Sequence, residues 1–164
     1  MIRLATPCEI EALGAVEKSA ATVFEGTHMS WAVASAHPPQ IYQRALEEGL
    51  LWVYDVGTVA GFVAASRQKD CIFIEELSVA RDYQRRGFGR ALLDTATARG
   101  AHLGCRAAVL ITDRHLPWNK PFYERAGFCV VPHDDVEPWL GRRLSLEAQT
   151  GLDPAHRCAM LKIL

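Results

Sequence analysis

The chain reads QRRGFGR from Gln84 to Arg90, shortly after the apolar run Ile72–Val79 and directly before a helical pattern, Ala91–Ala101. The first N–H groups of a helix have no partner within the helix, and the helix dipole adds partial positive charge there. A strand, a basic glycine turn and a helix start therefore make a binding place for a phosphate group. Glycines let the backbone approach a ligand, and arginines add charge-assisted hydrogen bonds. The turn supplies both: Gly87, Gly89, Arg85, Arg86 and Arg90, with Phe88 between the glycines.

Spacing excludes two other phosphate motifs. The turn is not a P-loop, because no Gly-Lys-Ser/Thr follows at the required spacing. It is not the dinucleotide-binding fingerprint, because Arg81–Arg86 separates the strand from the first glycine of the turn. A lone Gly-x-Gly is also compatible with an ordinary helix start that carries a solvated basic surface. The surrounding sequence therefore has to decide between these interpretations.

Those surroundings resemble the GNAT superfamily of acetyl-CoA-dependent N-acetyltransferases. The pattern Gln84-x-x-Gly87-x-Gly89 is similar to the family's central motif, Gln/Arg-x-x-Gly-x-Gly/Ala, and Leu77–Tyr83 is similar to the strand and turn that lead into it. Downstream, Phe122–Phe128 reads FYERAGF and resembles the family's second signature, an aromatic-Tyr-x-x-x-Gly-Phe helix end. The close resemblance covers roughly Val53–Val131. It implies an acetyltransferase that takes its acetyl group from acetyl-CoA.

Length and composition agree with one enzyme domain over residues 1–164. The net charge of −1 gives no bulk attraction to nucleic acid, and no apolar run approaches the ~20 residues that cross a membrane. The start of the chain lacks the apolar stretch of a signal peptide. Five widely spaced cysteines without a C-x-x-C pair argue against zinc and for reduced thiols, so we expect a cytoplasmic protein without a metal.

The hydrophobic pattern alternates between strands and helices and predicts an α/β fold. Thr6, Pro7 and Glu9 form a capping-box signal that begins the first helix. Asp55–Thr58 is a hairpin turn. The predicted strands are 2–4, 50–54, 59–65, 71–79, 107–112, 128–131 and 157–164, and the further helices are 40–48, 91–101, 117–126 and 135–150.

This order resembles the GNAT core, which is a mixed, mostly antiparallel, twisted sheet of about seven strands with helices on both faces. In that family the fourth and fifth strands are parallel and splay apart, and acetyl-CoA lies between them. The resemblance implies that pantetheine pairs with the backbone of Leu77, Ser78 and Val79 in the manner of an added strand. The pyrophosphate would then lie on the N–H groups of residues 85–90.

Acetyl transfer needs a neutral amine, whereas an alkyl amine with a pKa near ~10.4 is mostly protonated at neutral pH. A base is therefore useful. Glu75 and Glu76 stand just before the expected cofactor-binding backbone, where the family often has a glutamate as base or amine ligand. Adjacent strand residues normally face opposite sides, so one should point into the cleft unless a bulge intervenes. We favour Glu75 slightly over Glu76 as the base. The alternative is that both are solvated charges at the end of a strand.

The CoA thiolate that leaves can be protonated by a positioned acid. Tyr123 matches the family's general-acid tyrosine, and its hydroxyl, with a reference pKa near ~10, can donate a proton at neutral pH. The alternative is a tyrosine that only packs in the core. The family's cofactor-contacting asparagine normally lies seven residues before this tyrosine, where this chain has Leu116. Asn119 lies only four before it, so it either reaches the cofactor or caps a helix.

The acceptor is expected to be a primary amine of a small molecule that receives acetyl directly in a ternary complex. Two alternatives remain: an enzyme that acetylates a protein or peptide amine, and a non-catalytic module that binds acyl-CoA. An enzyme acting on nucleotide phosphates is disfavoured, because this sequence has no Mg²⁺ ligands near the turn. His115 is an alternative base. The helix over 135–150 could cover the acceptor side or form a homodimer surface. Other acceptor-side candidates are Glu25, His28, Trp31, Asp113, Trp118, Asp134, Asp135 and Trp139.

Overall fold

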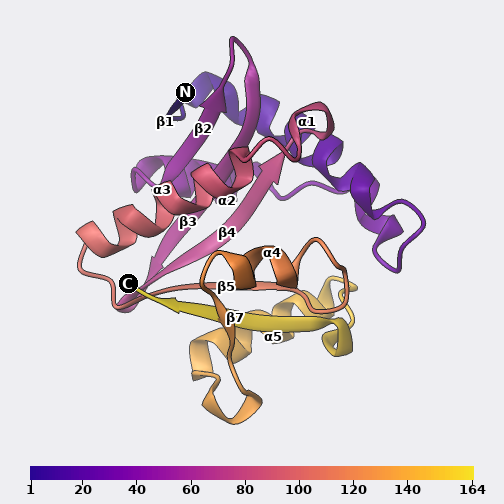
Figure 1. The fold of residues 1–164 in the computed structure, drawn as a ribbon, viewed down its shortest axis with the longest axis vertical. Coiled ribbons are helices and arrows are strands. Elements are labelled where there is room, and N and C mark those ends of the chain that lie inside the picture. The colour runs from indigo at the N-terminus through magenta and orange to yellow at the C-terminus, as the bar shows by residue number, and fades with distance from the viewer.

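The computed structural model describes residues 1–164, apart from the side chain of Ala34. Its seven strands form one sheet in the order β1-β2-β3-β4-β5-β7-β6 (Figure 1). Every neighbouring pair is antiparallel except β4 and β5, which are parallel. The strands are β1 (Ile2–Leu4), β2 (Leu51–Asp55), β3 (Val59–Gln68), β4 (Cys71–Val79), β5 (Ala107–Asp113), β6 (Cys129–Val130) and β7 (Arg157–Ile163). The predicted mixed, mostly antiparallel sheet is confirmed.

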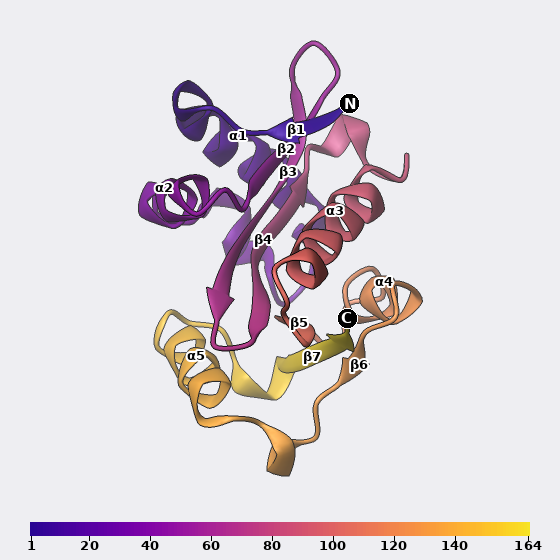
Figure 2. The same cartoon turned by 90° about the vertical axis from the view of Figure 1, so that its left-hand side faces the viewer.

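Helices cover both faces of the sheet, as Figure 2 shows: α1, α2 and α5 lie on one side, and α3 and α4 on the other. The α3 side buries the largest apolar cluster, which includes Leu92, Leu93 and Ile72. The α1–α2 side and the α5 side each bury a smaller cluster. The helices are α1 (Ile10–Ala21), α2 (Pro39–Glu47), α3 (Phe88–His102), α4 (Lys120–Arg125) and α5 (Pro138–Gln149). No helix in the described part of the chain is long and apolar enough to span a membrane.

Local sequence signals set the helix ends. The Thr6 N–H donates to Glu9 Oε2 at 2.8 Å, so the predicted capping box forms ahead of α1. The left-handed Gly87, with φ +84°, precedes the first residue of α3, so this helix begins at Phe88 and not at Ala91 as predicted. Three cysteines, Cys71, Cys105 and Cys158, are buried, two are exposed, and all five are free thiols.

Strands β4 and β5 stay together for only three residues each. Cys71–Phe73 pairs with Ala107–Val109, and beyond that point the strands separate. From there β4 continues to Val79 along β3, and β5 continues to Asp113 along β7. Figure 1 shows the wedge that results, with α4 in front of it. The splay implied by the resemblance is therefore confirmed, and it leaves one edge of β4 open.

A β-bulge lies in β4 at Glu75. Ala64 pairs with Glu76 and Ala65 pairs with Ile74, so Glu75 is the extra residue on β4. The bulge changes which residues face α3. Ile72 and Ile74, which precede the bulge, pack in the α3 cluster, and so do Leu77 and Val79, which follow it. Strict alternation from Ile74 would place Glu76 on the α3 face. The bulge places it on the opposite face instead.

Gly100 allows α3 to pack closely on β4, and its replacement is a direct test of the core. A Cβ built at Gly100 would lie 2.5 Å from Ile72 Cγ2 and 3.0 Å from Leu164 Cδ1. Gly100→Ala should therefore lower the free energy of unfolding by about 1–3 kcal/mol through overpacking. Gly141→Ala in α5 is the matched control, because its Cβ would meet only Val136 at 3.8 Å.

We expect Gly141→Ala to raise the free energy of unfolding by up to about 1 kcal/mol, since alanine is the better helix former. Urea unfolding of both variants measures the two changes. Equal effects of the two substitutions would contradict the packing described for α3.

Candidate active site

A cavity of about 850 Å³ lies along the open edge of β4. Leu77 and Val79 of β4 line it, together with the glycine turn and Asn119 and Tyr123 of the α4 segment. The sequence thus predicted two segments, 84–90 and 119–123, that the fold brings to the same cavity. Its volume suits an extended cofactor.

The turn before α3 presents free backbone N–H groups. Arg85 has φ +61° and Gly87 has φ +84°, which curls the chain into the helix. The first N–H with a partner in the turn of the helix is that of Ala91, which donates to Gly87 O at 3.0 Å. The preceding N–H groups, of residues 88–90, are those a helix leaves unpaired and can donate to an anion. A Cβ at Gly89, which lines the cavity, would lie 3.6 Å from Val79.

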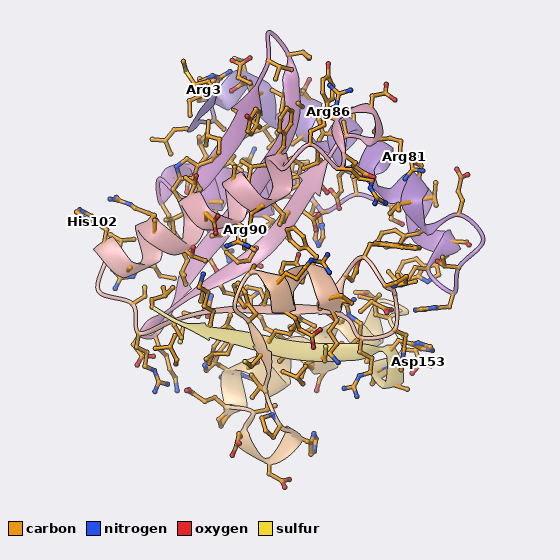
Figure 3. All side chains as sticks on the ribbon, in the orientation of Figure 1. Arg3, Arg81, Arg86, Arg90, His102 and Asp153 are labelled. Atoms are coloured by element: carbon orange, nitrogen blue, oxygen red, sulfur yellow. The ribbon has the colours of Figure 1, made fainter. Side chains whose placement is uncertain are left out.

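Two predicted cofactor-binding side chains support the turn itself. The amide of Gln84 donates to Val79 O at 3.0 Å, which ties the turn to the end of β4. Arg90 pairs with Asp94 at 2.8 Å and donates to Arg125 O at 3.0 Å, so it links α3 to α4 (Figure 3). These two side chains therefore contact the protein itself, and Gly87 and Gly89 leave the backbone of the turn accessible from the cavity.

The remaining side chains of the turn divide between packing and exposure. Phe88 stacks on Tyr54 with ring centroids 3.8 Å apart, which anchors the start of α3 to β2. Arg85 and Arg86 are exposed, and the guanidinium of Arg86 lies 5.4 Å from the centre of the Tyr83 ring. These two arginines remain the side chains most available to a phosphate group.

Tyr123 lies at the inner part of the α4 segment. Its ring packs edge-on against Phe122 and Phe128, and it lines the cavity. Burial raises the pKa of the Tyr123 hydroxyl, and the nearby Glu76 carboxylate raises it further, so the hydroxyl keeps its proton at neutral pH. Asn119 is the N-cap residue of α4 without a side-chain cap bond, and it also lines the cavity.

Glu75, which we expected slightly ahead of Glu76 as the base, is bound in an ion pair. Arg143 of α5 donates to both of its oxygens at 2.7 and 2.9 Å, and Ser66 donates at 2.6 Å. The Arg143 guanidinium also lies over the Phe73 ring at 4.2 Å. Three donors therefore engage the Glu75 carboxylate, and the order of the two glutamates as base stays a prediction.

Glu76 lines neither cavity, but it lies beside residues that do: His37 at the smaller cavity and Leu77 at the larger one. Ser78 donates to Glu76 Oε1 at 2.7 Å, and His37 Nδ1 lies 3.5 Å from Glu76 Oε2. Burial raises the pKa of the Glu76 carboxyl; His37 opposes this rise and Glu17 adds to it. A carboxylate with a raised pKa accepts a proton more readily than a solvated one.

His37, two residues before α2, is held by Glu17 of α1. Its Nδ1 lies 2.7 Å from Glu17 Oε1, and the Tyr42 hydroxyl donates to Glu17 Oε2. The bond to Glu17 is the main reason that the pKa of His37 rises to about 9. Because this pKa is raised, the interaction stabilises the fold fully below the ordinary value of 6.5 and is lost as pH rises through about 9.

A second cavity, of about 410 Å³, lies on the other face of the sheet between α2 and α5. Ile41, Ile111 and Leu146 give it apolar walls. His37 and Glu75 also line it, which brings it to the bulge. The two cavities therefore approach β4 from opposite faces.

The match to a protein family decides the identity. The model of the acetyltransferase (GNAT) family matches residues 15–128. The chain belongs to the GNAT acetyltransferase family. This confirms the resemblance carried by the glycine turn and by the FYERAGF segment.

Solved structures share the fold at low sequence identity. PaiA N-acetyltransferase from Thermoplasma acidophilum, in complex with coenzyme A, has a TM-score of 0.74 at 15% identity over 100% of this chain and 98% of that chain. N-acetylglutamate synthase from Neisseria gonorrhoeae, complexed with coenzyme A and N-acetyl-glutamate, has a TM-score of 0.73 at 16% identity over 100% and 35%. The ribosomal-protein-S18-alanine N-acetyltransferase from Escherichia coli has a TM-score of 0.69 at 18% identity over 99% and 92%.

A histidine cluster lies at the far end of β5 in this GNAT chain. His28 Nε2 is 2.5 Å from Asp113 Oδ2, and the His28 ring stacks on His156 at 4.1 Å. Asp113 is fully buried and accepts the N–H groups of His115 and Leu116, each at 2.8 Å. Hydrogen bonds from His28 and these N–H groups outweigh burial and hold the pKa of Asp113 below its usual range.

Asp113 and His28 therefore connect the α1–α2 loop to β5. We had expected these two residues to contact the acceptor. His115, the alternative base, is exposed and lies near Ala155 O at 3.3 Å, and it does not line either cavity. Ligand atoms of His28, Asp113 and His156 lie within 4.8 Å of one another, as do those of Glu17, His37 and Glu76. The second set is an internal ion pair and not a cation site, because a protonated His37 ring has no lone pair for a metal.

Three other acceptor candidates lie elsewhere than expected. Trp139 is buried against Phe73. Trp118 lines the larger cavity, which the glycine turn also lines. Asp134 lies in an exposed turn. The sequence analysis did not predict the contacts of Arg143 with Glu75 or of His37 with Glu17 and Glu76. The pairing of Arg143 with Glu75 spans 68 residues, and no local pattern signals a contact at that separation.

Proposed function

We propose that this GNAT chain is an acetyl-CoA-dependent N-acetyltransferase that moves the acetyl group to a primary amine of a small molecule, by direct transfer in a ternary complex. The observation that carries this proposal is the pair of cavities on the two faces of the sheet, which approach the β4 bulge from opposite sides. One cavity would take the acetyl donor and the other the amine.

The larger cavity suits acetyl-CoA. The N–H groups of residues 88–90 would receive the pyrophosphate, and the open edge of β4 over Leu77–Val79 would pair with pantetheine. The coenzyme A present in two structures of the same fold supports this assignment. The thioester would then lie between β4 and Tyr123, which both line this cavity.

In the proposed transfer, Glu76 accepts a proton from the amine as its nitrogen attacks the thioester carbon. The C–N bond forms, the C–S bond breaks, and Tyr123 gives its hydroxyl proton to the departing thiolate. Glu76 and Tyr123 have opposite tasks: Glu76 takes up a proton, whereas Tyr123 is protonated at neutral pH and gives its proton to the thiolate only as the C–S bond breaks. Exchange with water then removes the proton from Glu76 and returns one to Tyr123.

The smaller cavity favours a small acceptor over a folded protein. Its volume of about 410 Å³ lies at the lower end of the range for small-molecule sites. Helix α5 covers one side of it through Arg143 and Leu146. An acceptor with an apolar body and a terminal amine fits the apolar walls. The test is release of free CoA from acetyl-CoA in the presence of amines, amino acids, polyamines, aminoglycosides and peptides.

We expect turnover with at least one small amine and little with peptides. Turnover with peptides alone would replace the small-molecule acceptor by a protein acceptor. Binding of acetyl-CoA without turnover on any amine would instead favour a non-catalytic acyl-CoA-binding module.

The Gly89→Val substitution tests the donor site. The first added carbon meets only ordinary contacts, 3.6 Å from Val79 and 3.8 Å from Phe122, so the variant should fold. The two further methyl groups would occupy space where the pyrophosphate approaches the backbone. We expect at least tenfold weaker binding of acetyl-CoA in calorimetric titration, with an unchanged melting temperature. An equal affinity for acetyl-CoA in a folded variant would show that the donor does not bind at this turn.

Paired glutamate variants test which carboxylate is the base. Glu76→Gln should lower kcat roughly 10²-fold or more at neutral pH and recover partly at high pH, where free amine is abundant. Glu75→Gln is the matched control, because it keeps the shape but weakens only the pair with Arg143, and we expect a milder loss without a change in pH profile. Steady-state rates across pH decide, and a larger loss in Glu75→Gln would restore that residue as the base.

The Tyr123→Phe substitution removes one hydroxyl and keeps the packing against Phe122 and Phe128. A general acid at this position predicts a fall in kcat of about 10²-fold, with the affinity for acetyl-CoA nearly unchanged. Steady-state kinetics and calorimetry on the same preparation separate the two quantities. An unchanged kcat would leave Tyr123 with a packing role and water as the proton donor.

A further inference from the structure

Two carboxylates and one imidazole meet on the α1–α2 side of the bulge. His37 Nδ1 lies 2.7 Å from Glu17 Oε1 and 3.5 Å from Glu76 Oε2. The backbone N–H of His37 also donates to Glu17, at 2.9 Å to Oε2. His37 is thus fixed by a side-chain and a main-chain contact to the same carboxylate, with its ring against Glu76.

Glu17 is an unusual residue for its position. It lies on the inner face of α1, with only 9% of its surface exposed, among residues of an apolar cluster that includes Leu13 and Tyr42. A buried carboxylate is costly unless it is paired and hydrogen-bonded. Glu17 has both kinds of partner, because His37 and the Tyr42 hydroxyl contact its two oxygens. None of these contacts touches the acetyl-donor cavity, so donor binding gives no reason for them.

We propose that His37, clamped by Glu17 and Tyr42, is a positioning residue whose positive charge keeps the half-buried Glu76 carboxyl ionised and therefore ready to take the proton of the acceptor amine. The inference rests on the proposed function, because it assigns Glu76 as the base. Without His37, two carboxylates would share one poorly solvated site, and one of them would take up a proton.

The other charged groups around Glu76 leave this task to His37. The neighbouring Glu75 is neutralised by Arg143 of α5, at 2.7 Å. Arg157 of β7 also acts on Glu76, but its guanidinium is bound to Glu147 at 2.7 Å. Ser78 and Tyr123 are uncharged at neutral pH.

His37 is therefore the cation in contact with the base. The pKa of His37, about 9, keeps the ring protonated over the pH range in which Glu76 must lose its own proton.

Opposite charge changes should move the pH profile in opposite directions. His37→Gln removes the cation, so the acidic limb of the kcat/KM profile should move up by about one pH unit, the lower end of what one opposite charge at this range causes. Glu17→Gln removes a neighbouring negative charge, so the same limb should move down. A merely structural role would lower activity in both variants without moving the limb in opposite directions.

Two further variants serve as matched controls. His37→Lys keeps a positive charge just before α2, and the acidic limb should return toward the wild-type position. His102→Gln makes the same chemical change at the exposed far end of α3 and should leave the profile unchanged (Figure 3). Melting temperatures identify variants that are unfolded.

A measurement without turnover separates this inference from the proposed function. In the ¹⁵N spectrum of the wild-type protein, both ring nitrogens of His37 should be protonated at pH 7, and the ring should titrate near pH 9. The ¹³C signal of the Glu76 carboxyl should show ionisation at pH 7 in the wild type and a titration at higher pH in His37→Gln. A neutral His37 ring at pH 7, or an unmoved Glu76 titration, overturns the proposal even if the protein acetylates amines.

Discussion

Strands β4 and β5 hydrogen-bond to each other only as far as Phe73 and Val109, whereas β4 stays paired with β3 and β5 with β7 along their lengths. Their separation leaves the edge of β4 without a partner strand. In most sheets an unpaired edge inside the molecule would be costly, since buried backbone groups need hydrogen bonds. Here the edge lines a cavity of about 850 Å³, where a ligand can supply them.

The bulge at Glu75 determines which face of the sheet the Glu76 carboxylate lies on. One extra residue in β4 keeps apolar side chains on the α3 face on both sides of the bulge, with Ile74 before it and Leu77 after it. Glu76 is placed on the α1–α2 face, where His37 and Glu17 contact it or lie close to it. The register shift therefore places Glu76 beside His37, directly after Glu75, which is paired with Arg143.

Much of the fold could be predicted from local patterns. The glycine turn, the FYERAGF segment and the apolar runs located the sheet, α3 and α4, because turn chemistry and periodicity act over a few residues. The splay was implied by the family resemblance. Gln84 and Arg90 were correctly placed at the turn, but their side chains bind the chain itself through Val79 and Asp94.

The acceptor side could not be predicted in the same way. Arg143 pairs with a residue 68 positions earlier, and His37 joins α1 to β4 through contacts 20 and 39 positions apart in the chain. Such contacts depend on how helices pack on the sheet, which no short motif encodes. The face on which Glu76 lies depends on a bulge of one residue, and strand periodicity alone does not predict a bulge.

The crystal structure of the protein with bound coenzyme A tests the central claim most directly. The account predicts the pyrophosphate on the N–H groups of residues 88–90, pantetheine paired with the backbone of Leu77–Val79, and the sulfur between β4 and Tyr123. Strands β4 and β5 should remain apart beyond Phe73 and Val109. Coenzyme A bound elsewhere, or a closed β4–β5 pair beyond these residues, would contradict it.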